Sequence, residues 1–216
     1  FNTLLTAISG HCDLLLLRHD NPDDEDFPDL KQISQNSNRA AALVGQLLAF
    51  SRKQTLRPEE IDLRDTISDL THLLNRLVGE KVTLSFSHDP MLSSIRADKR
   101  QLEQVLMNLV VNARDAIEDV GEMRIVTEGL SLTGPMERDR ATVPPGDYVS
   151  VKVIATGTGI SADKVTKVFE PFYTTKRVGE GTGLGLSTAY GIIKQTGGYI
   201  FVDSTPGEGT CFTLLF

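Results

Sequence analysis

Cysteine is scarce in this sequence: the 216 residues include two, Cys12 and Cys211. They lie near opposite ends of the chain and have none of the short spacings that metal-binding cysteines show. Disulfides persist in oxidising compartments, where small proteins that depend on them carry many cysteines. The low count is therefore typical of a protein from a reducing compartment, and we expect the chain to fold without covalent cross-links.

Long apolar runs and basic clusters are missing as well. A helix that crosses a bilayer needs about 20 consecutive apolar residues, and no run in this sequence approaches that length. The formal net charge is -7 with no cluster of Lys and Arg, which argues against a nucleic-acid partner. Hydrophobic residues make up 40% of the chain, enough for an ordinary core in one large or two small domains.

The first part of the chain is helical by its apolar spacing. Apolar side chains recur at steps of three and four residues over 1–19, which predicts a helix. An acidic connector with two prolines follows at 20–28, and the same spacing resumes from Leu30 to about Gln54. We expect an antiparallel hairpin that buries its apolar stripe against a second copy in a four-helix bundle, which makes the protein a homodimer. The alternative is a hairpin folded back on its own domain.

A proline predicts the domain boundary. Thr55-Leu-Arg-Pro58 ends the second helix, because proline cannot continue a helix and restricts the residue before it. We therefore predict two domains, residues 1–56 and 57–216. In the second domain, helices and strands in mixed order predict an α/β sandwich with helices on one face of a mixed sheet, so the whole chain is α+β.

The elements of the second domain follow from periodicity and capping residues. Helices are predicted from Asp62 to Gly79, from Asp98 to about Asp119, and from a glycine-rich stretch to Gly197. The predicted strands are 82–86, 123–132, 147–154, 199–203 and 210–216, with a loop rich in Pro, Gly and Arg between the second and the third.

The glycine-rich stretch at 179–187 is the most unusual feature of the sequence. Four of its glycines stand at alternate positions, and an apolar segment with helical spacing follows. Such a backbone can close its N–H groups round an anion, and the helix N-terminus adds partial positive charge. The stretch predicts a phosphate site, with Lys176 and Arg177 just before it as further positive charge. Taken alone, it could equally be a flexible surface loop.

Asn108, Asn112 and Asp115 form a polar stripe beside the apolar stripe of the long helix. Polar groups in that position are half-buried and need hydrogen-bond partners. Mg²⁺ takes oxygen ligands and keeps phosphate oxygens and waters around it, so one or two amide oxygens suffice for a site. The alternative is that the amides bond to neighbouring strand edges.

A second glycine motif, Ala155-Thr-Gly-Thr-Gly-Ile160, follows a predicted strand and allows a flat ligand or phosphate to approach closely. Residues 157–162 match the dinucleotide pattern G-x-G-x-x-A. We reject a Rossmann fold because Phe169-Glu-Pro171 cuts the next helix short and no second parallel strand with an acid follows. A P-loop is excluded, since no glycine precedes Lys-Ser or Lys-Thr.

Together these stretches resemble the catalytic domain of sensor histidine kinases, with the Bergerat (GHKL) ATP-binding fold. The resemblance covers residues 57–216, and Phe1-Asn-Thr-Leu-Leu with the hairpin is similar to the tail of the H box in the dimerisation and phosphotransfer domain. The similar motifs are Asn108–Ala116 for the N box, Ala155–Ile160 for G1, Phe169–Phe172 for the F box, Gly181–Gly185 for G2 and Gly207–Thr210 for the last glycine box.

The resemblance implies that the chain binds ATP with Mg²⁺. Asn112 would ligate Mg²⁺ with Asn108 beside it, and Thr210 would lie under the adenine. Gly157 and Gly159 would let the base approach. The other residues that it assigns to the nucleotide site, including the phosphate-wrapping lid glycines, are Asp115, Ala155, Lys176, Gly181, Thr182, Gly183, Leu184 and Gly185.

The same resemblance implies the activity and the partners. Related ATPases hold a glutamate base where this chain has Asn108, which cannot deprotonate water, so the site is suited to phosphoryl transfer rather than hydrolysis. The phosphoryl group would pass to a histidine of the dimer and then to an aspartate of a response-regulator receiver or a phosphotransfer protein. We expect a cytoplasmic domain, attached to a membrane only through segments outside this chain.

The resemblance leads to a separate expectation at each of three positions. The phosphoacceptor histidine would fall two places before Phe1, so we expect a fragment that cannot phosphorylate itself. Ala155 stands where the family has an aspartate for the adenine amino group; the lost hydrogen bond would weaken ATP about 10- to 150-fold, and we favour an engineered change. Thr3 lies where the family orients water to dephosphorylate the regulator, so phosphatase activity could survive the alanine.

Two other functional classes remain open from the sequence. One is an ATPase of the gyrase, Hsp90 and MutL type, which Asn108 and the helical hairpin disfavour. The other is a decayed nucleotide-sensing or dimerisation module without catalysis, which Ala155 favours.

Overall fold

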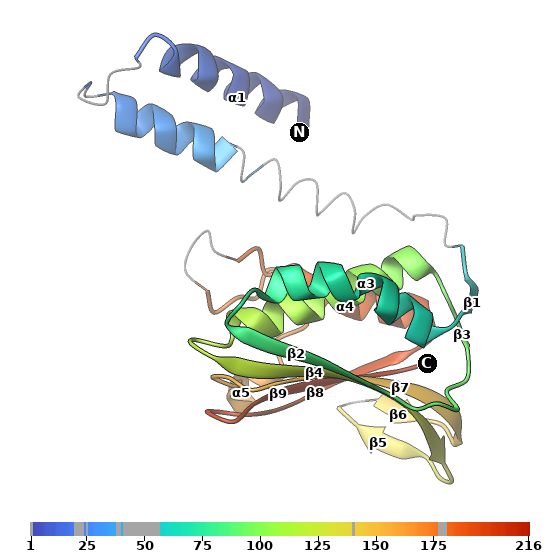
Figure 1. Ribbon diagram of the computed structural model, residues 1–216. Helices are drawn as coiled ribbons and strands as arrows, with labels where there is room; N and C mark the ends of the chain where they lie inside the picture. The colour runs from blue at the N-terminus through green and yellow to red at the C-terminus, as the bar shows by residue number, and fades with distance from the viewer. Residues whose placement is uncertain are drawn as a thin grey trace. The chain divides into compact units, whose positions relative to one another are not determined.

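The architecture comes from a computed structural model of the chain, which describes residues 2–19, 24, 26–37, 40, 57–139, 141–176 and 181–216. The chain divides into two compact units (Figure 1). One is made of Phe1–Thr55 with Lys176–Thr182, and the other of Leu56–Thr175 with Gly183–Phe216.

The described residues of the first unit form α1 (Asn2–Leu16), where the sequence predicted a helix, and a helix at 27–37, which begins within the predicted connector and continues into the predicted second helix. The Ser9 and Ser37 hydroxyls are hydrogen-bonded at 2.9 Å and join the two. Ile8 of the predicted apolar stripe is 45% exposed in the single chain. The rest of the second predicted helix lies outside the described residues, and the four-helix bundle stays a prediction.

A five-stranded mixed sheet organises the second unit, in the order β2-β4-β7-β9-β8. β2 and β4 are parallel, and the other neighbours are antiparallel. The strands are β2 (Val82–His88), β4 (Gly121–Leu132), β7 (Gly146–Ala155), β8 (Tyr199–Thr205) and β9 (Gly209–Leu215).

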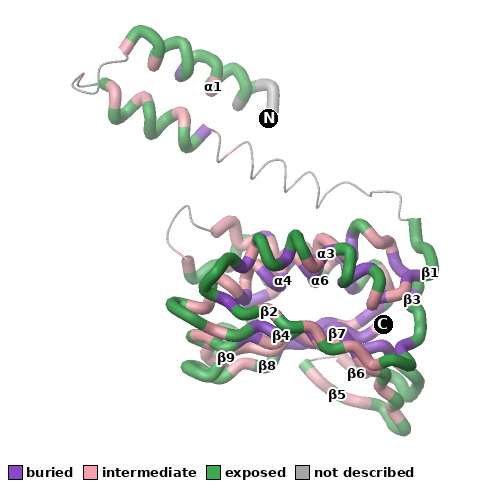
Figure 2. The backbone as a smooth tube through the Cα atoms, in the orientation of Figure 1, coloured by how far each residue is buried: buried purple, intermediate pink, exposed green. Residues whose placement is uncertain are grey.

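Three helices cover one face of this sheet: α3 (Leu63–Val78), α4 (Lys99–Asp115) and α6 (Gly185–Gln195) (Figure 1). Figure 2 shows that their buried sides face the buried residues of the strands. The α/β sandwich with a mixed sheet is therefore confirmed. The largest fully buried side chains of this core include Ile67, Leu74, Leu102, Leu106, Leu109, Met123, Ile125, Ile193 and Leu214.

The other face of the sheet carries an element that the sequence did not predict. The expected loop between β4 and β7 contains a hairpin of β5 (Met136–Arg138) and β6 (Ala141–Val143). Val143 is fully buried against Phe201, and the Arg138 guanidinium lies 4.9 Å from the centre of that ring. Strands of three residues are too short to show alternation, so only packing on the sheet reveals them.

Helix α4 is shorter than predicted and ends at Asp115 rather than near Asp119. The Ala116 and Ile117 N–H groups bond three residues back, which tightens the last turn. A Cβ at Gly121, where β4 begins, would lie 2.7 Å from Ile117 Cγ2. Gly121 therefore allows the start of β4 to pack closely against the turn after α4, a contact that periodicity cannot show.

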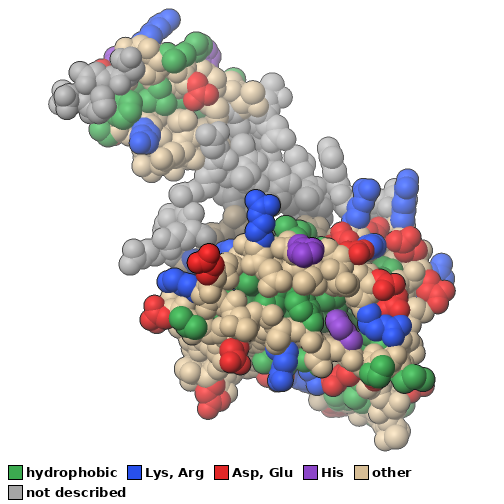
Figure 3. All heavy atoms as spheres, viewed as in Figure 1, with side chains coloured by type: hydrophobic (Ala, Val, Ile, Leu, Met, Phe, Trp, Pro, Cys, Tyr) green, Lys and Arg blue, Asp and Glu red, His purple; other side chains and the backbone are tan. Residues whose placement is uncertain are grey.

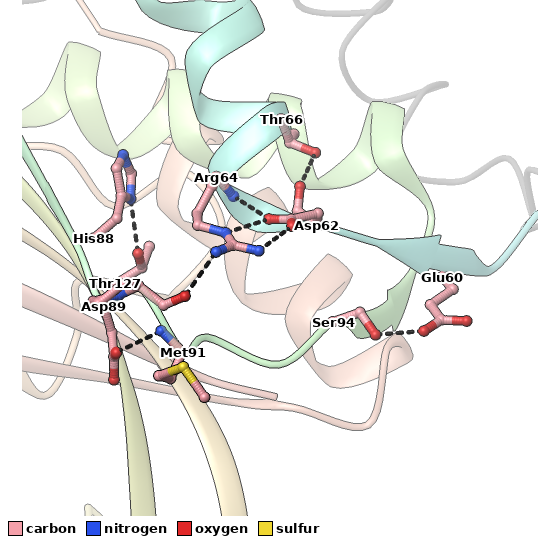
Figure 4. Close-up of polar contacts among 10 residues, drawn as sticks. Glu60, Asp62, Arg64, Thr66, His88, Asp89, Met91, Ser94 and Thr127 are labelled. Carbon is pink, nitrogen blue, oxygen red and sulfur yellow. Dashed lines mark hydrogen bonds and ion pairs between the residues drawn. The ribbon is translucent and has the colours of Figure 1, made fainter.

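Two aspartates begin the long helices, as the sequence predicted. Asp98 accepts from the Gln101 N–H at 3.2 Å at the start of α4. Asp62 accepts from the Arg64 N–H at 2.8 Å, and the Arg64 guanidinium bonds both to that carboxylate and to the Pro90 carbonyl (Figure 4). The side-chain and backbone hydrogen bonds from Arg64 lower the pKa of Asp62 to about 2. This ion pair ties the start of α3 to the turn after β2.

Two further elements are short. β1 (Glu59–Ile61) pairs antiparallel with β3 (Ile95–Ala97), and α5 (Ala162–Val165) follows β7. No helix in the described part of the chain is long and apolar enough to cross a membrane.

Candidate functional site

Asn108 and Asn112 lie one turn apart on α4, and both are half-buried. The Asn108 Nδ2 donates to the Gly185 carbonyl at 3.1 Å, and the Asn112 Nδ2 donates to the Asn108 carbonyl at 2.6 Å. Because the nitrogens make these bonds, the oxygen of each amide is the side-chain atom left for a cation.

Gly185 begins α6 directly beside these amides. A Cβ at this residue would lie 3.1 Å from the Asn112 Nδ2 and 3.9 Å from the Asn108 Cγ. The absence of a side chain therefore lets the first turn of α6 approach α4 closely. Backbone N–H groups at the start of this helix have no partner within the helix, which is the usual setting for a phosphate.

Gly183 is fixed against the residues of the predicted F box. Its carbonyl accepts from the Phe172 N–H at 2.9 Å, and its φ of 65° is left-handed. A Cβ at Gly183 would lie 2.4 Å from the Phe172 carbonyl carbon. Phe172 itself has a φ of 67°. The two backbones therefore form a close pair that only glycine at position 183 permits.

The G1 glycines pack against neighbouring backbone. A Cβ at Gly157 would lie 2.4 Å from the Ala116 carbonyl oxygen, and a Cβ at Gly159 would lie 2.1 Å from the Thr205 carbonyl oxygen. The loop is thus wedged between the end of α4 and the turn after β8. The φ angle is 150° at Gly157 and 66° at Gly159, both positive values that residues with a side chain rarely adopt. This packing gives a structural reason for the glycines besides the approach of a base.

Ala155 ends β7 and is 5% exposed. It lies opposite Thr210 of β9 in the sheet register, and Thr210 lies opposite Ser204 of β8. The Ser204 hydroxyl bonds to the Thr210 hydroxyl at 2.7 Å and accepts from the Ile160 N–H at 2.8 Å. Sequence reasoning missed Ser204, because nothing in a strand of alternating residues distinguishes this serine from a solvent-facing one.

The other predicted residues lie in three places. Leu184 occupies the position just before α6 and is buried. Asp115 is exposed at the end of α4, where it pairs with Arg114. The residues that belong to the first unit, whose position relative to the second is not determined, are Thr3, Lys176, Gly181 and Thr182. Arg177 and the first two residues of the glycine-rich stretch, 179–180, lie outside the described residues.

A hollow of about 520 Å³ lies elsewhere in the second unit. It is lined by the first residues of β7, by Thr196 after α6 and by Phe216. Ala155 and Gly185 stand at the opposite ends of the same two elements. The hollow is therefore separate from the candidate site. On the face in view, acidic and basic side chains are interspersed over the second unit (Figure 3).

The sequence profile of one family matches residues 97–216, and that family is described as histidine kinase-, DNA gyrase B-, and HSP90-like ATPase. This stretch contains α4, the sheet from β4 onward and every described site residue except Thr3. The chain belongs to this family.

Curated relatives place it among the sensor histidine kinases of the family. It is 52% identical to the sensor kinase CckA of Brucella abortus (strain 2308), over 99% of this chain and 22% of that protein. It is 32% identical to the sensor histidine kinase ZraS of Escherichia coli (strain K12), over 84% of this chain and 36% of that protein. The chain thus spans between a fifth and two fifths of the length of these relatives.

Solved histidine kinases have the same fold. The structure of full-length ShkA in complex with AMPPNP matches with a TM-score of 0.69 at 23% identity, over 100% of this chain and 43% of that chain. The catalytic domain of histidine kinase ThkA matches with a TM-score of 0.56 at 27% identity, over 74% and 97%. ThkA in complex with the response regulator TrrA matches with a TM-score of 0.65 at 23% identity, over 100% and 58%.

Replacing Gly183 by alanine tests the close pair with Phe172. Gly197, which has a φ of 80° and no atom within 4 Å of where a Cβ would lie, is the matched control for backbone strain alone. We expect Gly197→Ala to lower the free energy of unfolding in urea by about 1 kcal/mol, and Gly183→Ala by about 3 kcal/mol because the clash adds to the strain. Equal losses in the two variants would contradict the close pair.

Proposed function

We propose that this chain is the core of a two-component histidine kinase that binds ATP and Mg²⁺ between α4 and the start of α6. The observation that carries the proposal is the bond from Asn108 to Gly185, which holds amide oxygens and a helix N-terminus side by side. A triphosphate with a divalent cation needs this combination of oxygen ligands and free N–H groups.

The residues present fit the nucleotide and its metal. Asn112 would ligate Mg²⁺ with Asn108 beside it, since their side-chain nitrogens already have protein partners. A Mg²⁺ ion held by these residues would supply positive charge that offsets the charge of the phosphates during phosphoryl transfer. The base would lie against Thr210 between the G1 loop and Ala155, with its 6-amino edge toward the Ala155 and Thr210 side chains, and residues 183–185 would cover the phosphates. Asp115 and Leu184 complete the proposed nucleotide site within the second unit.

The chemistry follows from the residue at position 108. An amide cannot take a proton from water, so a site with Asn108 presents the γ-phosphoryl group to another nucleophile and acts by positioning. The proposed nucleophile is a histidine of the dimerisation helices, and the proposed second acceptor is an aspartate of a receiver domain or a phosphotransfer protein. We propose residues 1–56 as the dimerisation and phosphotransfer domain and residues 57–216 as the catalytic domain.

Ala155 favours a second candidate, a nucleotide-sensing or dimerisation module without kinase activity. The residue is buried at the end of β7, where the family places the carboxylate that binds the adenine amino group. Its methyl group offers no acceptor. Titration of ATP with Mg²⁺ by calorimetry, on this chain and on Ala155→Asp, separates the two candidates.

For a kinase site that has lost one residue, Ala155→Asp binds ATP about 10- to 150-fold more tightly than the unchanged chain. Adding Asn112→Ala to Ala155→Asp removes the dependence of that affinity on Mg²⁺. Leu73→Ala, an exposed change on α3, is the control and leaves both affinities unchanged. Absence of binding in both the chain and Ala155→Asp would contradict the kinase assignment and support the decayed module.

The proposed homodimer is tested by light scattering. The expected mass is twice the 23.7 kDa of one chain. Ile8→Glu on α1 places a charge in the proposed bundle and is expected to give the mass of one chain. Leu73→Glu is the control, because Leu73 is 43% exposed and Ile8 is 45% exposed. Leu73 lies on α3, outside the proposed bundle, so this variant is expected to remain a dimer. A monomer before any substitution would refute the dimer.

Thr3 is proposed to orient water for dephosphorylation of the partner regulator, a reaction that needs little from the adenine site. In a chain extended to include a phosphoacceptor histidine, Thr3→Ala is expected to slow decay of the phosphorylated regulator at least tenfold, because the attacking water is no longer held in position. ATP affinity is the control and stays the same. An unchanged decay rate would remove this role.

A further inference from the structure

Three residues form a row across the strands at one end of the sheet. Ala155 of β7 faces Thr210 of β9, and Thr210 faces Ser204 of β8. Alternation along each strand puts all three on the same face as Phe212 and Val202, which belong to the core under the helices. The row therefore lies on the helix-covered side of the sheet, next to the G1 loop.

Ser204 is the polar centre of this row. Its Oγ lies 2.8 Å from the Ile160 nitrogen, 2.8 Å from the Gly209 carbonyl oxygen and 2.7 Å from the Thr210 Oγ1. One side chain thus joins the G1 loop, the turn between β8 and β9, and the threonine beside Ala155.

Hydrogen-bond chemistry assigns the protons in this cluster. A serine hydroxyl has one proton and two lone pairs. The Gly209 carbonyl can only accept, so the Ser204 proton goes to it, and the Ile160 N–H can only donate to the serine oxygen. The Thr210 hydroxyl must then donate its own proton to Ser204. The lone pairs of the Thr210 oxygen are left to accept from a ligand.

We propose that Ser204 is a positioning residue for base selection: by taking the Thr210 proton, it makes the Thr210 oxygen an acceptor toward the base. This inference rests on the proposed nucleotide site. Adenine carries a 6-amino donor, whereas hypoxanthine carries a 6-oxo acceptor at the same place. An acceptor fixed at Thr210 therefore favours ATP over ITP, two ligands with the same ribose and triphosphate. Since Ala155 has no polar side-chain atom, Thr210 carries this discrimination in the row.

A purely structural role makes a different prediction. If Ser204 only held the G1 loop and the β8–β9 turn together, its loss would loosen the site for every nucleotide alike. Selection acts on the ratio of the ATP and ITP affinities, whereas loosening lowers both equally. The ratio therefore separates positioning from packing.

The test is an NMR titration of the complete 15N-labelled chain with ATP and with ITP in the presence of Mg²⁺, which measures weak as well as tight binding. Ser204→Ala is expected to lower the ratio of ATP to ITP affinity about fivefold, the value of one oriented hydrogen bond. Thr210→Val, which keeps the shape and removes the hydroxyl, lowers it to the same extent. The double variant lowers it no further, because both changes remove one interaction.

Two controls accompany these variants. Ser204→Thr keeps the hydroxyl and is expected to retain the ratio. Ser150→Ala on β7 removes a serine hydroxyl in the same way as Ser204→Ala. Ser150 is 1% exposed, and its hydroxyl has no hydrogen-bond partner among the described residues. It is expected to leave both affinities unchanged.

The outcomes distinguish this inference from the proposed function. Suppose that the chain binds ATP selectively, and that neither Ser204→Ala nor Thr210→Val changes the ratio of ATP to ITP affinity. The role of Ser204 is then overturned, and the proposed nucleotide site is unaffected. Equal weakening of ATP and ITP also overturns it, in favour of packing. If neither nucleotide shifts any amide signal, in the chain or in Ala155→Asp, the proposed function fails and the inference fails with it.

Discussion

The Asn108 side chain donates to the first carbonyl of α6 at 3.1 Å, and this bond holds two helices from distant parts of the chain at one spacing. Gly185 has no side chain, which allows the two helices to approach this closely. The contact places the Asn108 side chain beside the start of α6. Both the metal ligands and the phosphate donors of the proposed site depend on this approach.

The rest of the site is assembled around that contact by close backbone packing. Gly183 is pressed against Phe172, and Gly157 and Gly159 are pressed against the Ala116 and Thr205 carbonyls. Ser204 joins the G1 loop to the β8–β9 turn by hydrogen bonds. Ala155 lies at the end of this arrangement, with the surrounding geometry intact. The proposed nucleotide site thus differs from the family pattern at Ala155, within closely packed surroundings.

Sequence patterns predicted the parts of the molecule whose signal is local. Asp62 and Asp98 cap the long helices where they were expected, and α3 and α4 have the predicted apolar stripes. The end of α4 was predicted four residues late, because periodicity does not show the tightened turn at Ala116 and Ile117. The β5–β6 hairpin and the role of Ser204 were missed, because both depend on residues that meet only in the folded sheet.

The central claim is that Asn108, Asn112 and the start of α6 face one bound nucleotide and its metal. Mn²⁺ in place of Mg²⁺ tests it directly, because the paramagnetic ion broadens NMR signals of nearby protons. With ATP and Mn²⁺ together, the side-chain amides of Asn108 and Asn112 and the backbone amide of Gly185 are expected to broaden, while residues around the hollow near Phe216 stay sharp. Sharp signals at α4 and α6 under saturating ATP and Mn²⁺ would contradict the account.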